Sequence, residues 1–261
     1  MGKTSDFRVD YDQIAHLYDQ QPFRNKNVDQ HLLDFLRERE ITTFSEIAIL
    51  DMACGTGNQL AANSPHVPGA RLVGLDLFQG MLRQAMSKSR DILWVRATCE
   101  CPLFPANSFD FISNHYAFHH VRDKAVMLKA VFRILRPGGR FVMVNVCPRE
   151  MQDWIYYQYF PEALTIDLQD FLSKEEIVNM LKQEGFRVSM SLGSFMAEWS
   201  LAQFHDIISR RDTCSQLMAI SDASYQAGLE RLEQEARREN DSQQRVSSKG
   251  SILTIIADKP A

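Results

Sequence analysis

Short, largely apolar runs alternate with amphipathic stretches between residues 45 and 146, and this alternation limits the fold more than any other feature of the sequence. The runs have the length of buried strands, and the stretches between them have helical spacing. The expected strands are 47–50, 71–75, 92–95, 109–113 and 140–146, and the expected helices are 57–62, 78–87 and 124–135. Strands that alternate with helices predict an α/β fold with a doubly wound, mostly parallel sheet.

The segments on either side of this region complete the predicted organisation. Residues 1–40 contain two helical patterns and are expected to form an N-terminal helical lid segment, followed by one domain over 41–261. Insertions at about 149–172 and 198–245 are expected to extend the lid. The further expected elements are helices at 11–20, 27–38 and 174–184, strands at 186–191 and 251–257, a helical region at 198–239 and a mobile polar loop at 240–250.

Composition excludes several classes of protein. Hydrophobic residues make up 45% of the 261 residues, which is enough for the core of one large α/β domain. The formal net charge of −4 leaves no basic excess for coating nucleic acid. The N-terminus lacks the apolar stretch of a secretory signal, and runs such as 141–144 are too short to span a bilayer. We therefore expect no stable membrane insertion.

The cysteines favour a cytoplasmic protein without a metal site. Their number is odd and their spacings are irregular, so with no export signal reduced thiols are expected. Cys99 and Cys101 are separated by one residue, but no second pair of ligands follows at a zinc-like spacing. The five are Cys54, Cys99, Cys101, Cys147 and Cys214.

A glycine-rich turn follows the first expected strand, in the stretch Ile49-Leu-Asp-Met-Ala-Cys-Gly-Thr-Gly-Asn58. Glycines let a ligand approach the backbone closely. The dinucleotide fingerprint G-x-G-x-x-G fails in both registers, because Ala53 and Asn58, or Leu60, stand where glycines are required. A P-loop fails as well, since no Gly-Lys-Ser/Thr follows. The turn predicts either a nucleoside site of another kind or a helix entry with no ligand.

Four motifs, in the correct order, resemble those of the class I S-adenosylmethionine (SAM) dependent methyltransferases. Asp51-x-Ala-Cys-Gly-Thr-Gly57 resembles motif I, and Asp76 resembles the acid that binds the SAM ribose. Residues 101–121 resemble the segments around the fourth strand, and 134–142 the turn into the fifth. Alanine at position 53 is typical of the small-molecule subset that includes the ubiquinone/menaquinone-type, methyltransferase type 11-like enzymes.

The resemblance implies a seven-stranded Rossmann-like sheet of order 3-2-1-4-5-7-6, with the seventh strand antiparallel. It implies SAM as the methyl donor and S-adenosylhomocysteine as the product. The cofactor-binding residues that it implies are Asp51, Ala53, Gly55, Gly57, Asp76, Leu77, Thr98, Cys99, Asn114, Tyr18 and Arg24.

Three of these assignments carry particular expectations. The family often has Asp-Ala after the third strand, where this chain has Thr98 and Cys99, so adenine recognition is expected to depend on backbone groups and apolar contacts such as Leu77. Asp51 is expected to bind the SAM amino group, although it could instead cap the next helix. Arg24 could pair with the SAM carboxylate, or belong to an ordinary amphipathic segment.

The segment after the fourth strand supplies the candidate catalytic residues. His119 and His120 are the candidate bases and His115 a candidate substrate contact, since this segment faces the reactive methyl in the family. Packing and local hydrogen bonding are the alternative for each. Tyr156, Tyr157 and Tyr159 either line a substrate pocket or bury an insertion helix.

These features predict an enzyme that moves a methyl group from SAM to a small organic acceptor, with C- or O-methylation favoured, in metabolite biosynthesis. A homo-oligomer is compatible with the sequence. A protein or RNA methyltransferase is one alternative, but the acidic net charge gives it little support. A non-catalytic SAM-fold partner protein is another, although Asp51, Gly55, Gly57 and Asp76 are all intact.

Overall fold

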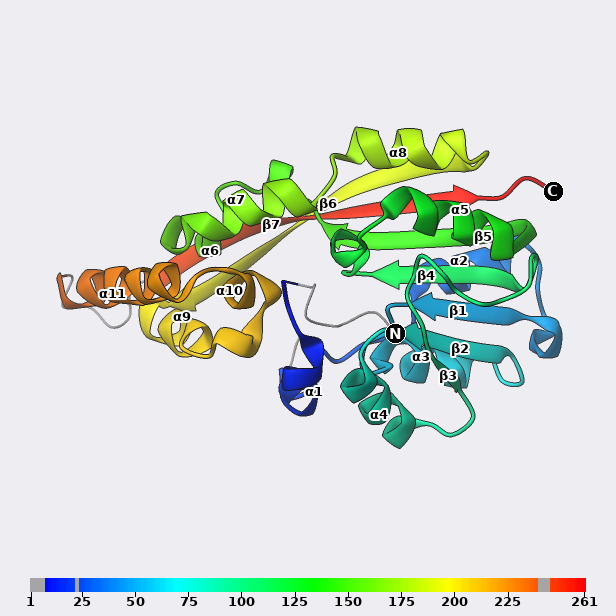
Figure 1. Ribbon diagram of the computed structural model, residues 1–261, viewed down its shortest axis with the longest axis horizontal. Coiled ribbons are helices and arrows are strands. Elements are labelled where there is room, and N and C mark those ends of the chain that lie inside the picture. The colour runs from blue at the N-terminus through cyan, green and yellow to red at the C-terminus, as the bar shows by residue number, and fades with distance from the viewer. Residues whose placement is uncertain (1–7, 22–23, 239–244) are drawn as a thin grey trace. The chain divides into compact units, whose positions relative to one another are not determined.

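The computed structural model describes residues 8–21, 24–238 and 245–261 (Figure 1). The chain divides into two compact units. The sheet unit comprises the described residues within 11–145, 174–191 and 254–261, and the aromatic unit those within 1–10, 146–173 and 192–253. Every helix in the described part of the chain is too short or too polar to cross a membrane.

The described strands form a seven-stranded sheet in the order β3-β2-β1-β4-β5-β7-β6, which confirms the predicted topology. Their bounds are β1 Ala48–Met52, β2 Arg71–Asp76, β3 Leu93–Arg96, β4 Phe109–His115, β5 Leu135–Val146, β6 Arg187–Ser200 and β7 Arg245–Asp258. Strands β1 to β5 pair in parallel. The chain order reverses between β1 and β4, and such a switch point is where open α/β sheets bind ligands.

Strand β7 runs antiparallel to β5. The Lys259 N–H donates to the Gly139 carbonyl near the start of β5, and the Cys147 N–H donates to Ser251 at the other end. Pairs whose numbers rise on one strand and fall on the other define an antiparallel ladder. The arrow of β7 accordingly points opposite to those of β1 and β4 (Figure 1).

The helices of the sheet unit are α1 Tyr11–Tyr18, α2 Gln30–Glu38, α3 Asn58–Asn63, α4 Gln79–Lys88, α5 Lys124–Ile134 and α8 Lys174–Gln183. Two of them begin at an aspartate whose side chain accepts a backbone N–H. Asp29 caps α2 through the N–H of His31, and Asp123 caps α5 through that of Val126, both at 2.9 Å. Such caps satisfy N–H groups that the helix leaves unpaired.

Strands β1 and β4 pack one face against α2. Ile49 and Phe111 are register partners, and both are buried in one cluster with Leu32 of α2. Because side chains alternate along a strand, Asp51 and His115 lie on this same face, nearer the carboxyl ends. The start of α2 and the ends of β1 and β4 therefore meet at one edge of the sheet.

The last two strands are longer than the sequence predicts. Strand β6 was expected to end at 191 but continues to Ser200, so 198–200 are strand and the prediction of helix there is wrong. Strand β7 begins at Arg245, so the predicted loop is wrong for 245–250, and 240–244 lie outside the described residues. Strand β6 pairs with β7, and most of its residues are exposed, apolar ones such as Met190 and Leu192 included, so it shows no buried strand pattern.

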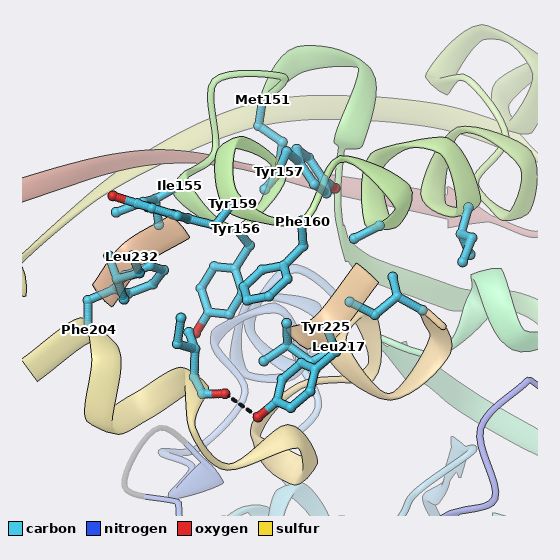
Figure 2. Close-up of a cluster of buried hydrophobic side chains, with 14 of the residues drawn as sticks. Met151, Ile155, Tyr156, Tyr157, Tyr159, Phe160, Phe204, Leu217, Tyr225 and Leu232 are labelled. Carbon is cyan, nitrogen blue, oxygen red and sulfur yellow. Dashed lines mark hydrogen bonds between the residues drawn. The ribbon is translucent and has the colours of Figure 1, made fainter. Parts of the chain in front are cut away.

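The aromatic unit contains α6 Ile155–Tyr159, α7 Pro161–Asp170, α9 Leu201–Ile208, α10 Ser215–Ala219 and α11 Asp222–Arg238. Tyr156, Tyr157 and Tyr159 lie in its buried core (Figure 2). The Tyr157 hydroxyl donates to Asp167 at 2.6 Å, and that of Tyr159 donates to Glu235 at 2.7 Å. These contacts agree with the packing alternative, and contact with a substrate stays a prediction.

Candidate active site

The turn between β1 and α3 follows a left-handed backbone path. Ala53, Gly55 and Gly57 all have positive φ, at 59°, 55° and 75°. A Cβ added at Gly57 would lie 2.4 Å from the ring of Trp94, whereas one added at Gly55 would meet no atom within 4 Å. Gly57 is therefore required by packing on Trp94, while Gly55 borders open space in which a ligand can approach the backbone.

Asp51 is a buried acid that ends β1. Its Oδ1 accepts a hydrogen bond from Ser113 at 2.8 Å, and no other hydrogen bond to its side chain is found among the described residues. The pKa of Asp51 is raised from 3.8 to about 7, chiefly by burial. The hydrogen bond from Ser113 opposes this rise, and the charges of Asp29 and Asp76 contribute to it. A buried carboxylate of this kind is stabilised by a cation, and the ammonium group of SAM is one.

Asp76 ends β2 and is held by the backbone. Its Oδ2 accepts the N–H of Gly55 at 2.8 Å, and its Oδ1 accepts that of Phe78 at 2.9 Å. Burial raises its pKa to about 6, and these backbone bonds oppose that effect. The carboxylate ties the glycine turn to the end of β2, where hydroxyl groups of a ribose would find an acceptor.

Thr98 and Cys99, which follow β3, bring no charge to this edge. Cys99 is buried, and burial raises the pKa of its thiol, so the side chain is neutral. The backbone carbonyl of Thr98 accepts the N–H of Cys101, and that of Leu77 accepts from Arg96. Contacts of Leu77, Thr98 and Cys99 with adenine stay predictions, and neither of the last two offers a carboxylate for them.

Arg24 and Tyr18 form a pair in the N-terminal part of the sheet unit. The Arg24 Nη1 donates to the Tyr18 hydroxyl at 2.8 Å, and the guanidinium carbon lies 4.1 Å from the ring centre. Burial raises the pKa of Tyr18, the charge of Arg24 lowers it, and that of Asp76 raises it. The pair thus lies close to the predicted cofactor site, and its contact with SAM stays a prediction.

Lys26 was missed by the sequence reasoning. Burial and the charge of Arg24 lower its pKa, whereas Asp51 raises it. Its ammonium lies 5.0 Å from the ring centre of Tyr116. A cation beside Asp51 could have been foreseen only by knowing that residues 24–29 pass over the end of β1.

Asp19 was also missed, and it joins α1 to the glycine turn. Its carboxylate accepts hydrogen bonds from Thr56 at 2.7 Å and Asn58 at 2.8 Å, and pairs with Lys88 at 2.5 Å. Burial raises the pKa of Asp19, but these three partners outweigh it and the net shift is downward. The segment after α1 is therefore fixed to the loop that carries the predicted cofactor contacts.

The candidate bases His119 and His120 lie in a short helical turn after β4. Their ring centres are 3.8 Å apart, Asn145 lies 3.2 Å from the Nδ1 of His119, and the Tyr11 hydroxyl lies 2.9 Å from the Nε2 of His120. Burial lowers the pKa of both, to about 4 for His120 and well below 6.5 for His119, and Lys124 adds to the effect. Both imidazoles are neutral near pH 7.

Asn114 and His115 end β4 on opposite faces. Asn114 Nδ2 donates to the Met52 carbonyl at 2.8 Å, and its Oδ1 is buried without a hydrogen-bond partner among the described residues. His115 Nε2 lies 3.5 Å from Oδ2 of Asp29. Asp29 was not predicted as a site residue, and the sequence offers only its position before a helix as a signal.

The described residues fit SAM in three respects. Asp51 and Asp76 are buried carboxylates with raised pKa values, and a positive charge or hydroxyl donors on a ligand would stabilise their ionised forms. Gly55 borders open space, and the neutral imidazoles of His119 and His120 add no positive charge of their own that would oppose a sulfonium. In the described part of the chain, no three His, Cys, Asp or Glu side chains are grouped as metal ligands.

Comparison with known proteins identifies the family. A family described as a methyltransferase domain matches residues 50–143. The demethylmenaquinone methyltransferase of Chlorobaculum tepidum is 30% identical over 169 residues, which cover 61% of this chain and 68% of that protein. The ubiquinone/menaquinone biosynthesis C-methyltransferase of Syntrophotalea carbinolica is 28% identical over 175 residues, covering 57% and 72%.

The chain belongs to the class I SAM-dependent methyltransferases. It is an enzyme that transfers a methyl group from SAM to a small molecule. This methyltransferase has the fold of Haemonchus contortus phosphoethanolamine N-methyltransferase 2, solved with SAM, at a TM-score of 0.58 and 18% identity over 96% of this chain and 57% of that one. Geranyl diphosphate C-methyltransferase from Streptomyces coelicolor matches at 0.53 and 16%, covering 88% and 77%. At such identities the likeness shows the fold alone.

Proposed function

We propose that this methyltransferase methylates a ring carbon of a hydroxylated aromatic small molecule, of the class to which quinone precursors belong, in the cytoplasm. Two relatives that share more than a quarter of their aligned residues with it are named for methylating such precursors. Phenolic rings become strong carbon nucleophiles when the hydroxyl loses its proton. The reaction therefore needs a neutral base beside the methyl donor. The histidines at the end of β4 and in the turn after it, His115, His119 and His120, are the observation that carries the proposal.

SAM supplies an activated methyl group when bound, so the protein mainly has to position the acceptor and remove a proton. An imidazole at the end of β4 or in the turn after it accepts the hydroxyl proton of the acceptor. The electron pair that is released into the ring forms the new carbon–carbon bond, and the sulfur–carbon bond breaks. The ring carbon then loses its hydrogen as a proton, which restores the aromatic system.

The carboxylates of Asp51 and Asp76 hold the donor in this scheme. Asp51 offers one carboxylate oxygen beyond the one that Ser113 occupies, and Asp76 keeps the glycine turn closed on the end of β2. Both lie at the carboxyl ends of neighbouring strands. Positioning of this kind can account for a large part of the rate of a transfer between two bound molecules.

A panel assay with methyl-labelled SAM tests the proposal. The acceptors are hydroxylated benzenes and naphthalenes. Each is paired with its methyl ether, which cannot lose a hydroxyl proton and serves as the control. Amines, a protein extract and RNA represent the alternative acceptor classes. Label is expected on a ring carbon of the free hydroxyl compounds, and not in their ethers. Label in the hydroxyl oxygen would replace the carbon assignment, and label only in amine, protein or RNA would refute it.

A further inference from the structure

Asp29 and His115 form a buried pair at the end of β4. The Nε2 of His115 lies 3.5 Å from Oδ2 of Asp29, with 13% and 3% of the two side chains exposed. Neither atom has a hydrogen-bond partner among the described residues. Two buried polar atoms that face each other without another partner are costly unless a proton is shared between them. A small movement of the His115 ring would close this contact to a hydrogen bond.

Asp29 itself is fixed at every other polar atom. Its Oδ1 accepts the N–H of His31 at 2.9 Å as the cap of α2, and its own N–H donates to Asn63 at 2.9 Å. The remaining oxygen, Oδ2, can only point where the cap geometry directs it, which is toward His115. The carboxylate is therefore a rigid acceptor rather than a mobile surface acid.

The pair belongs to the surroundings of the predicted cofactor site. The charge of Asp29 acts on Asp51, and Lys26 acts on both Asp51 and His115. Alternation along the strands places Asp51 and His115 on the same face, at the ends of the adjacent strands β1 and β4. No contact with the aromatic unit is needed to bring these residues together.

His115 has an acidic neighbour that would stabilise its protonated form, whereas the groups that act on His119 and His120 would destabilise theirs. A proton on His119 would meet the neighbouring ring of His120 and the charge of Lys124, and one on His120 would meet Lys124. Within the described residues, the side chains that act electrostatically on His115 are those of Asp29, Lys26 and His31, and of these three only Asp29 is acidic. Burial lowers the pKa of His115, and the Asp29 charge opposes that effect.

We propose that His115 is the general base of the methyl transfer and that Asp29 is its positioning residue. Asp29 Oδ2 accepts the Nε2–H of His115, which leaves Nδ1 unprotonated. Nδ1 takes the hydroxyl proton of the acceptor, and Asp29 stabilises the resulting imidazolium, as an acid partner does in other His-based sites. This proposal rests on the proposed function, which supplies the hydroxyl proton that the base removes. It assigns to His115 the role predicted for His119 and His120.

The variant Asp29→Asn tests the pair while keeping the helix cap. Asparagine is as good a cap as aspartate, so its Oδ1 stays on the His31 N–H and its amide N–H₂ turns toward His115. Nε2 must then become an acceptor, which moves the ring proton to Nδ1 and removes the base. We expect kcat with the best acceptor of the panel to fall by about 100-fold or more, with KM little changed.

Nitrogen-15 spectra of the histidine rings give a readout that does not require an acceptor. The wild-type enzyme is expected to show His115 protonated at Nε2, and Asp29→Asn to show it protonated at Nδ1 with a lower pKa. Asp123→Asn is the matched control, because Asp123 also caps a helix of the sheet unit through its side chain, at the same distance of 2.9 Å. It should change neither the His115 spectrum nor kcat.

The outcomes separate the two proposals. If no hydroxylated acceptor is methylated by the wild-type enzyme, the proposed function fails, while the ring spectra still test the pair. If the wild-type enzyme turns over such an acceptor but Asp29→Asn leaves both kcat and the His115 tautomer unchanged, the pair is refuted. A loss of activity with an unchanged tautomer would also refute it, because Asp29 would then affect turnover without orienting the His115 ring.

Discussion

Asp51→Asn is expected to stabilise the enzyme in the absence of cofactor and to weaken SAM binding. The carboxyl pKa rises from 3.8 to about 7 in the folded protein, and burial is the largest cause. Between these values the folded state holds a proton that the unfolded state has released, so stability falls as pH rises. Above pH 7 the ionised carboxylate costs about 4 kcal/mol relative to the unfolded chain.

The pH dependence isolates this cost from the other effects of the substitution. Asparagine keeps an oxygen for the Ser113 hydroxyl but adds a buried N–H₂, which offsets the gain by a constant amount. The same linkage gives a cost of about 2 kcal/mol at pH 5.5 and about 4 kcal/mol at pH 8. The advantage of Asp51→Asn over the wild type should therefore grow by about 2 kcal/mol between these two pH values.

Hydrogen exchange followed in peptides from β1 and β4 measures this difference within the sheet unit, without requiring the whole chain to unfold as one. Calorimetry with SAM measures the second effect, since loss of one charged hydrogen bond of about 1.5–3 kcal/mol weakens binding by about 10- to 100-fold. If the opening free energies of the two proteins differ equally at both pH values, Asp51 does not titrate as a buried acid. Unchanged SAM affinity would remove it from the cofactor site.

Three further changes probe the same edge of the sheet. Asp76→Asn should cost about 1–3 kcal/mol of stability, because an amide cannot accept both backbone N–H groups that the carboxylate holds. Because the pKa of Asp76 is raised to about 6, the stability of the wild type falls as pH rises through that value, so the deficit of the variant should be largest near pH 4 and smaller at pH 8. Thermal unfolding at the two pH values measures this, and a deficit that grows with pH would contradict it. Gly57→Ala should destabilise by about 1–3 kcal/mol through its positive φ and its contact with Trp94, and adding Trp94→Leu should restore part of the loss in the same assay. Asp19→Asn should increase hydrogen exchange in α1 at neutral pH, because the carboxylate that holds this segment to the glycine turn is lost. The pKa of Asp19 is lowered in the folded protein, so its stabilising effect is lost as pH falls below about 4, and the difference from wild type should shrink there.

The sheet could be predicted from the sequence because its strands carry their own signal. Strands β1 to β5 are short apolar runs separated by helices, and the order of the motifs assigned them to a known topology. Strands β6 and β7 carry no such signal over much of their length. Residues of β6 are exposed along most of the strand, apolar ones such as Met190 and Leu192 included, and pairing with β7, a long-range property, decides their conformation.

The site could be predicted only where motif and structure coincide. Asp51, Gly55, Gly57 and Asp76 follow strands in a fixed pattern, so their neighbourhood was foreseeable. Asp19, Lys26 and Asp29 reach the same edge from an N-terminal segment, and nothing in the sequence says where that segment runs. Asp29 and Asp19 are held there by hydrogen bonds to residues more than thirty positions away, Asn63 and Thr56, and Lys26 lies over the ring of Tyr116.

Asn58 takes the place of the third glycine of the dinucleotide fingerprint and has a role of its own in this fold. In a dinucleotide fold the third glycine lets the helix pack closely on the strand, and Asn58 stands at that position. Here its Nδ2 donates to Asp19 at 2.8 Å and to the Arg24 carbonyl at 3.1 Å. A glycine would lose both bonds and release the N-terminal segment from the turn. Asn58 therefore has two consequences. It breaks the dinucleotide fingerprint, and its hydrogen bonds hold the residues after α1 beside the glycine turn.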